Sequence, residues 1–190
     1  TFNSQFLDDA HQPFLFGAAT AAAQVEDDCD NHQWCRWVDE CNQSKKVKDN
    51  DLKKIPSCKT CAFDITYKKD IKRAHKVGLT ALRFSIEWSK VQPTKDNDFD
   101  DRVLDRYEDM CKECAKYNIV PLITLYHYTE PTWFWDMGSF EKAENTPYFV
   151  EFCAKMFERL NKYKPMWLTF NTPSGIMGKR YIKGQRPIRT

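Results

Sequence analysis

The sequence has few glycines, almost no net charge and no long hydrophobic run. Its 190 residues include only 6 glycines, which excludes collagen-like and linker-like character. A net charge of +2 is too small to indicate a nucleic-acid partner by itself. The longest apolar stretch, Ile119 to Tyr128, is interrupted by Thr124 and His127 and is far shorter than the roughly 20 residues of a membrane span. We therefore expect no nucleic-acid partner and no membrane span.

Aromatic residues, in contrast, are abundant. The chain contains 13 Phe, 8 Tyr and 6 Trp, and 42% of its residues are hydrophobic. So much apolar surface excludes disorder as the main state of the chain. The composition and length predict a globular protein with a single domain over residues 1–190.

Cysteine is also frequent, and five of the eight cysteines lie in a polar, lysine-rich stretch, 27–62, that we expect to be a long loop. They are Cys29, Cys35, Cys41, Cys58 and Cys61. Disulfides in this loop would imply an oxidising compartment. Cys58 and Cys61 could instead start a zinc site, but the other three cysteines do not supply a second closely spaced pair, and free thiols remain a third interpretation. We predict no metal site and expect no cofactor.

Helical and strand-like patterns alternate along the rest of the chain. Apolar runs predict strands, the first of them buried, and periodic apolar residues predict helices, one of which would bury Cys111 and Cys114 as ordinary thiols. The expected strands are 14–17, 79–84, 119–126 and 165–170, and the expected helices are 66–77, 101–117 and a helix beginning at 146. This alternation predicts a parallel sheet with crossover helices.

Polar residues follow each expected strand at its carboxyl end, where parallel α/β folds collect their functional groups. They are Gln24, Arg83, His127 and Asn171, with Trp88, Tyr128, Trp133 and Trp135 nearby. One such residue alone is more often a satisfied structural group, but four at equivalent places predict a shared site. Hydrogen-bonding groups beside aromatic faces suit a hydroxylated, ring-shaped ligand.

Four ordered motifs resemble glycoside hydrolase family 1, the β-glucosidases and their relatives. They read FLFGAATAAAQVE at 14–26, LRFSIEWSKVQP at 82–93, PLITLYHYTEP at 121–131 and WLTFNTP at 167–173, and Tyr181, Gly184 and Pro187 continue the match. The resemblance covers about 14–187 and implies a TIM barrel, of which this chain would supply about the first four strands, with a cysteine-rich insertion after the first.

The resemblance also implies roles for the strand-end residues. Family members are retaining β-glycosidases with an acid/base and a nucleophilic carboxylate about 5–5.5 Å apart. By position, Gln24, His127 and Asn171 correspond to ligands of sugar hydroxyls, with Asn171 at the 2-hydroxyl. Arg83 corresponds to the residue that keeps the nucleophile ionised.

Two departures from the family pattern concern the catalytic carboxylates. Thr172 occupies the acid/base position, and a threonine hydroxyl cannot protonate a leaving group, which costs roughly 10²–10⁴ in rate. The family's nucleophile lies on a strand of the second half of the barrel, and the sequence stops at Thr190. Glu87 and Glu130 stand at the edges of motifs and do not fit that role.

These departures leave alternatives open. We expect a β-glucosidase-type scaffold that is inactive by itself and serves as a carbohydrate-binding or structural subunit. A full barrel needs about 250 residues, so a second barrel half or a larger assembly is the expected partner. Alternatively, the chain is the N-terminal half of an active retaining enzyme that hydrolyses O- or S-glycosidic bonds. A zinc or redox protein built on the cysteines is a third, less favoured hypothesis.

Overall fold

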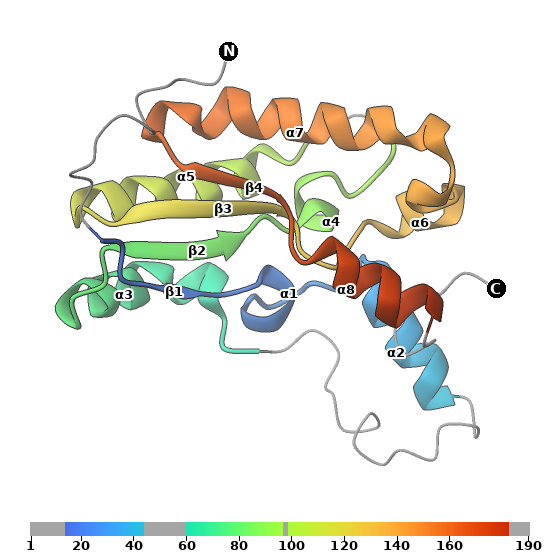
Figure 1. The fold of residues 1–190 in the computed structure, drawn as a ribbon, viewed down its shortest axis with the longest axis horizontal. Coiled ribbons are helices and arrows are strands. Elements are labelled where there is room, and N and C mark those ends of the chain that lie inside the picture. The colour runs from blue at the N-terminus through green and yellow to red at the C-terminus, as the bar shows by residue number, and fades with distance from the viewer. Residues whose placement is uncertain (1–13, 44–59, 97–98, 183–190) are drawn as a thin grey trace.

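A parallel four-stranded sheet forms the centre of the protein (Figure 1). The structure is a computed structural model, and it describes residues 14–43, 60–96 and 99–182. The strands lie in the order β1-β2-β3-β4, and each pairs in parallel with the next. Their bounds are Gly17–Ala19, Ala81–Ser85, Val120–Tyr126 and Met166–Phe170. The predicted parallel sheet is therefore confirmed.

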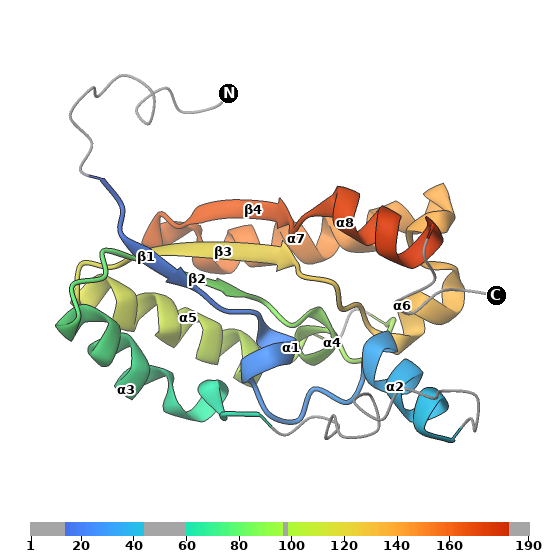
Figure 2. The same ribbon diagram turned by 60° about the horizontal axis from the view of Figure 1, so that its bottom comes forward.

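Three long helices, α3, α5 and α7, lie along the same side of this sheet (Figure 2). They span Phe63–Lys76, Asp101–Lys116 and Thr146–Leu160. Local chemistry sets their ends: the Asp100 carboxylate accepts from the first N–H groups of α5, Pro147 lies in the first turn of α7, and Gly78 takes φ 84° after α3. The predicted helices are thus confirmed, although α3 begins earlier than expected.

Short helices gather beyond the carboxyl ends of the strands (Figures 1 and 2). They include α1 (Ala22–Val25), α2 (Gln33–Gln43), α4 (Trp88–Val91), α6 (Thr132–Met137) and α8 (Pro173–Met177). Single turns complete the connections: η3 (Ser139–Glu141), η4 (Ala143–Asn145), η5 (Asn161–Tyr163) and the π-helical η6 (Gly178–Ile182). Within the described ranges, no helix combines the length and apolarity needed to cross a membrane.

The hydrophobic core lies between the outer face of the sheet and the long helices. Alternate strand residues such as Phe84 and Ile123 are 2% and 0% exposed, and they meet buried side chains of α5 and α7. Trp88 is the largest buried side chain and stacks on Phe152 with ring centroids 5.2 Å apart. Cys111 and Cys114 are fully buried free thiols of α5, as predicted.

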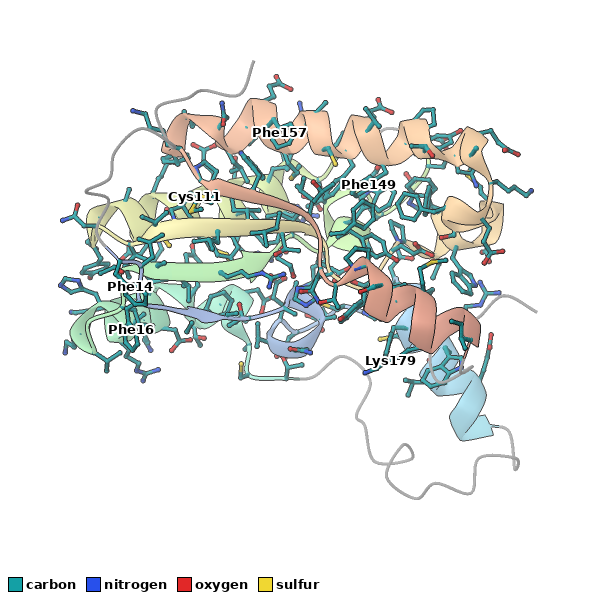
Figure 3. All side chains as sticks on the ribbon, in the orientation of Figure 1. Phe14, Phe16, Cys111, Phe149, Phe157 and Lys179 are labelled. Carbon is teal, nitrogen blue, oxygen red and sulfur yellow. The ribbon has the colours of Figure 1, made fainter. Side chains whose placement is uncertain are left out.

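The inner face of the sheet, in contrast, is only partly covered. Leu122 and Leu168 are only partly buried there, and Met166 is 41% exposed. The prediction of a buried first strand at 14–17 is wrong: β1 is exposed throughout, and Phe14 and Phe16 stand uncovered at its amino-terminal end (Figure 3). The reason is that β1 pairs with β2 on one side only, within the part of the chain described.

The cysteine-rich stretch is more ordered than the predicted loop. Within 27–62, residues Gln33–Gln43 form α2, while 44–59 lie outside the described residues. Cys29, Cys35 and Cys61 are free thiols, and Cys58 and the side chain of Cys41 lie outside the described part. Among the residues described, no three His, Cys, Asp or Glu side chains are arranged to hold a metal ion.

Candidate functional site

Arg83 links the carboxyl ends of three strands. It extends from β2, and its Nε donates to Thr124 Oγ1 of β3 at 2.8 Å, while its Nη2 donates to Asn171 Oδ1 after β4 at 2.7 Å. The parallel register makes this possible, because Ser85 of β2 pairs with Thr124 of β3, and Tyr126 of β3 pairs with Phe170, the residue before Asn171. We call Arg83, Thr124, His127 and Asn171 the strand-end site.

His127 follows β3 directly and is influenced by Arg83. Burial and the positive charge of Arg83 lower the pKa of the imidazole to about 4. The ring is therefore neutral near pH 7, with one nitrogen as donor and the other as acceptor. Its Nδ1 is buried and has no hydrogen-bond partner among the described residues. A neutral imidazole with an unused nitrogen suits a hydroxyl ligand.

Asn171 and Thr172 end β4 in different ways. The backbone N–H of Asn171 donates to the carbonyl of Tyr126 at 2.9 Å and continues the parallel ladder. Thr172 then adopts φ +46°, a left-handed conformation that is costly for a β-branched residue. It immediately precedes α8, and its side chain makes no capping hydrogen bond. Thr172, at the expected acid/base position, is thus an exposed residue with a strained backbone conformation.

Gln24, like Thr172, is a predicted site residue that lies outside this network. It is exposed on α1, the single turn that follows β1. The structure brings Arg83 and Asn171 into direct contact and places His127 within the electrostatic influence of Arg83. Gln24 shares the same end of the sheet, because α1 lies beyond the carboxyl end of β1 (Figure 1).

The predicted aromatic platform is only partly available to a ligand. Trp88 is 1% exposed and belongs to the core, so the expectation that it stacks on a ligand is wrong. Trp133 packs edge-on against it and donates from Nε1 to the carbonyl of Gln92 at 3.0 Å. Tyr128 stays at the strand ends, with its ring 5.3 Å from that of His127. Sequence motifs locate tryptophans but do not distinguish core rings from ligand-facing rings.

The two glutamates near the motifs are held by hydroxyl groups. Glu87 accepts from Ser89 and Thr129 at 2.8 Å each. Glu130 accepts from Tyr126 at 3.0 Å and Ser139 at 2.7 Å, and both carboxylates are buried. No carboxylate pairs with Arg83 anywhere in 14–43, 60–96 or 99–182. The strand-end site therefore supplies hydrogen bonds and positive charge.

Sequence reasoning missed Thr124 as a partner of Arg83. The signal was present, because Thr124 is a polar residue inside the apolar run of β3 and is 0% exposed. It also missed a buried cluster of charged and polar side chains behind α1: Glu26, Asp64, Lys90, Arg106 and Tyr107. These residues come from four separate segments, so no local spacing could have indicated them.

The fold and the strand-end site together define a partial (β/α) barrel with polar residues at the carboxyl ends of its strands. The sequence profile of Glycosyl hydrolase family 1 matches residues 7–188. The chain therefore belongs to glycoside hydrolase family 1.

Similar proteins and structures support this assignment. The chain is 33% identical over 181 residues to a 6-phospho-beta-galactosidase of Clostridium acetobutylicum, covering 93% of this chain and 36% of that protein. It is 29% identical over 168 residues to beta-glucosidase A of Acetivibrio thermocellus, covering 86% and 36%. The structure of a beta-glycosidase from Pyrococcus horikoshii superposes with a TM-score of 0.76 at 29% identity, covering 93% and 40%. The chain thus spans well under half the length of these relatives.

Proposed function

We propose that this chain is the sugar-binding part of a family 1 β-glycosidase scaffold and that by itself it binds a β-glycoside without hydrolysing it. The observation that carries the proposal is the pair of hydrogen bonds by which Arg83 fixes Asn171 and Thr124. A rigid polar network at strand ends is what recognition of a hydroxylated ring requires.

The geometry assigns each group a task in sugar binding. Because Asn171 Oδ1 accepts from Arg83, the amide nitrogen of Asn171 is oriented as a donor to a ligand oxygen. His127 offers a neutral ring nitrogen. Gln24 is exposed and can both donate and accept. By family resemblance, Asn171 would hold the 2-hydroxyl, a contact that strengthens in the transition state of glycoside hydrolysis.

Thr172 supports the absence of turnover. A threonine hydroxyl does not donate a proton at neutral pH, so the leaving oxygen would depart unprotonated. Arg83, which by resemblance supports the nucleophile, has only neutral hydrogen-bond partners in the described residues. Two carboxylates are needed for the retaining reaction, and neither role is filled by a residue of the strand-end site.

The ligand class follows from the relatives. The names of the similar proteins specify a β-glucosidase and a 6-phospho-β-galactosidase, both of which act on β-glycosides. We therefore choose a simple β-glucoside as the first ligand to test.

The expected partner is a second (β/α) barrel half. Two features support it: β1 and β4 each pair with one neighbour in the described part, and the inner face carries the exposed Met166 and the partly exposed Leu122 and Leu168. Unpaired parallel edges and exposed apolar side chains favour association. A second half would cover both.

The alternative is that the chain supplies the N-terminal half of an active retaining glycosidase. The observation in its favour is the extent of the similarity to the 6-phospho-beta-galactosidase, 33% identity over 93% of this chain. Activated leaving groups need little protonation, so Thr172 lowers but does not forbid turnover of such substrates.

A binding experiment tests the proposal directly. Methyl β-D-glucopyranoside is titrated into the purified chain and binding is followed by NMR. We expect weak saturable binding that falls at least about tenfold in Asn171→Ala. The matched control is Asn161→Ala, at an exposed position before β4. Absence of saturable binding to the natural chain would contradict the proposal.

A turnover experiment separates the proposal from the alternative. The natural chain and Thr172→Glu are incubated with 4-nitrophenyl β-D-glucopyranoside. We expect no release of nitrophenol from the natural chain. Turnover by the natural chain, alone or with a second barrel half, would favour the active-enzyme alternative.

A further inference from the structure

Helix α1, which carries Gln24, is too short to hold its own position. It has four residues, Ala22–Val25, and only Ala22 among them is buried. Isolated helices of one turn are unstable because nucleation costs more than one turn of hydrogen bonds returns. The position of Gln24 therefore depends on what fastens α1 at its two ends.

The amino-terminal end of α1 is fastened to the sheet. The backbone N–H of Ala22 donates to Ser85 Oγ at the end of β2, at 2.7 Å, and this bond is buried. The N–H of Thr20 donates to the carbonyl of Arg83 at 2.8 Å. These bonds fix where α1 begins, but they leave the direction of the turn undefined.

The carboxyl-terminal end is fastened through Glu26, which is only 1% exposed. Tyr107 Oη of α5 lies 2.9 Å from Glu26 Oε1 and 3.1 Å from Oε2. Lys90 Nζ of α4 lies 3.2 Å from Oε2, and Arg106 Nη2 of α5 lies 3.6 Å from it. One carboxylate thus connects α1 to two other helices.

The neighbouring residue adds a connection to α3. The N–H of Asp27 donates to Asp64 Oδ1 at 3.1 Å, and Lys90 donates to the carbonyl of Asp27. Lys90 also lies 3.5 Å and Arg106 3.8 Å from Asp64 Oδ2. We call Glu26, Asp64, Lys90, Arg106 and Tyr107 the Glu26 cluster.

The charge of Glu26 depends on its partners. The pKa of its carboxyl lies above the usual value because burial raises it, and Lys90, Arg106 and the hydrogen bond from Tyr107 offset part of this rise. Removing one member of a buried ion cluster leaves an uncompensated charge, which is strongly unfavourable. These partners therefore hold the Glu26 carboxylate in place at the end of α1.

We propose that the Glu26 cluster is a positioning device that orients α1 and thereby holds Gln24 where a sugar hydroxyl can reach it. The inference rests on the proposed function, since it assigns Gln24 to ligand binding. Glu26 stands two residues after Gln24, so only Val25 separates the cluster from the exposed Gln24 side chain. None of the five members is itself expected to touch the ligand.

The chain contains a matched control for this cluster. Glu108 of α5 has the same kinds of partner as Glu26: Tyr163 Oη at 2.9 Å, Lys162 Nζ at 2.9 Å and Arg159 Nε at 3.0 Å. Tyr163 and Lys162 belong to η5, directly before β4 and hence at the amino-terminal end of that strand. Disturbing Glu108 affects an ion cluster of similar composition away from α1.

The first arm of the test needs no ligand. Hydrogen exchange of the backbone amides of Gln24 and Glu26, which donate to Ala21 and Ala22 carbonyls at 2.8 Å, reports the integrity of α1. We expect Glu26→Gln to accelerate their exchange about tenfold and Glu108→Gln to leave it unchanged. Equal exchange in the two variants overturns the proposal, whether or not the chain binds sugar. If Glu26→Gln does not fold, Tyr107→Phe against Tyr163→Phe gives the same comparison.

The second arm measures affinity for methyl β-D-glucopyranoside in a double-mutant cycle. Glu26→Gln should weaken binding about five- to tenfold, and the same substitution in a Gln24→Ala background should have no further effect. Independent, multiplying effects of the two substitutions overturn the proposal, because a merely structural role would not act through Gln24. If the natural chain does not bind the glucoside, the proposed function is wrong, and the exchange arm alone decides whether the cluster orients α1.

Discussion

The two faces of the sheet in this protein differ sharply. On the outer face, Phe84 and Ile123 are almost completely buried beneath the long helices. On the inner face, Leu122 lies next to Ile123 in the same strand and is only partly buried. Strand β3 thus contributes buried side chains to the core on one side and a partly exposed apolar side chain on the other. We therefore expect packing on the outer face to stabilise the folded protein. The inner face and the strand ends are expected to bind ligands or partners.

The largest expected effect contrasts two adjacent residues of β3. Ile123→Ala opens a cavity in the core and should cost about 3–4 kcal/mol of unfolding free energy, whereas Leu122→Ala should cost about 1 kcal/mol. Urea denaturation followed by tryptophan fluorescence measures both values. Equal losses would mean that the inner face is covered in solution, for instance by a second barrel half.

The next effect concerns how helices begin in the outer layer. Asp100 accepts from the N–H groups of Arg102 at 2.9 Å and Val103 at 3.4 Å, so Asp100→Ala should destabilise α5 by about 1 kcal/mol. Asp101→Ala, at the first exposed residue of the helix, should cost distinctly less. Thermal unfolding by circular dichroism compares the two variants, and a reversed order would refute the assignment of Asp100 as the cap.

A smaller effect concerns the strand-end site and pH. The pKa of His127 falls from 6.5 to about 4 on folding, so the folded state binds fewer protons than the unfolded chain between these values. The contribution of His127 to the free energy of unfolding is fully present above about pH 6.5 and is lost as the pH decreases toward 4. Since the ring is partly exposed, we expect a loss on the order of 1 kcal/mol from about pH 7 to about pH 5.

His127→Gln should remove this part of the pH dependence, as measured by urea denaturation at both pH values. His75→Gln, at an exposed position of α3, is the control substitution. If the two variants retained the same pH slope as the natural chain, His127 would not be the group responsible.

The smallest effect concerns the strained residue after β4. Asn tolerates the left-handed region better than Thr, so Thr172→Asn should stabilise the protein by about 0.5 kcal/mol. Thr169→Asn, within β4, should instead destabilise it slightly, because β-branched residues favour strands. Melting temperatures of the two variants test this contrast. Destabilisation by Thr172→Asn would show that Thr172 makes a contact worth more than the strain.

Much of the fold could be predicted from the sequence because its signals are local. Apolar runs and helical periodicity indicated three of the four strands and the long helices. The first strand was misplaced and wrongly expected to be buried. Burial depends on what covers a strand, and a run of Phe and Leu carries no information about that.

The candidate site was predicted in part. The positions of Arg83, His127 and Asn171 followed from the motifs, and the structure adds the bonds that join Arg83 to Asn171 and Thr124. The prediction for Trp88 was wrong, because an aromatic ring within a motif can equally well belong to the core. Thr124 was passed over because its role requires the register between two strands.

The sequence by itself determined the alternation of strands and helices, the identity of the strand-end residues and the presence of a threonine where the family resemblance predicts the acid/base residue. These depend on residue type and spacing along one segment. Only the tertiary structure decided that the inner face is partly uncovered, that Arg83 ties together three strands and that the Glu26 cluster joins α3, α4 and α5 to the end of α1. The physical reason is that a buried carboxylate is stabilised only by partners brought to it from distant segments, and folding alone brings them there.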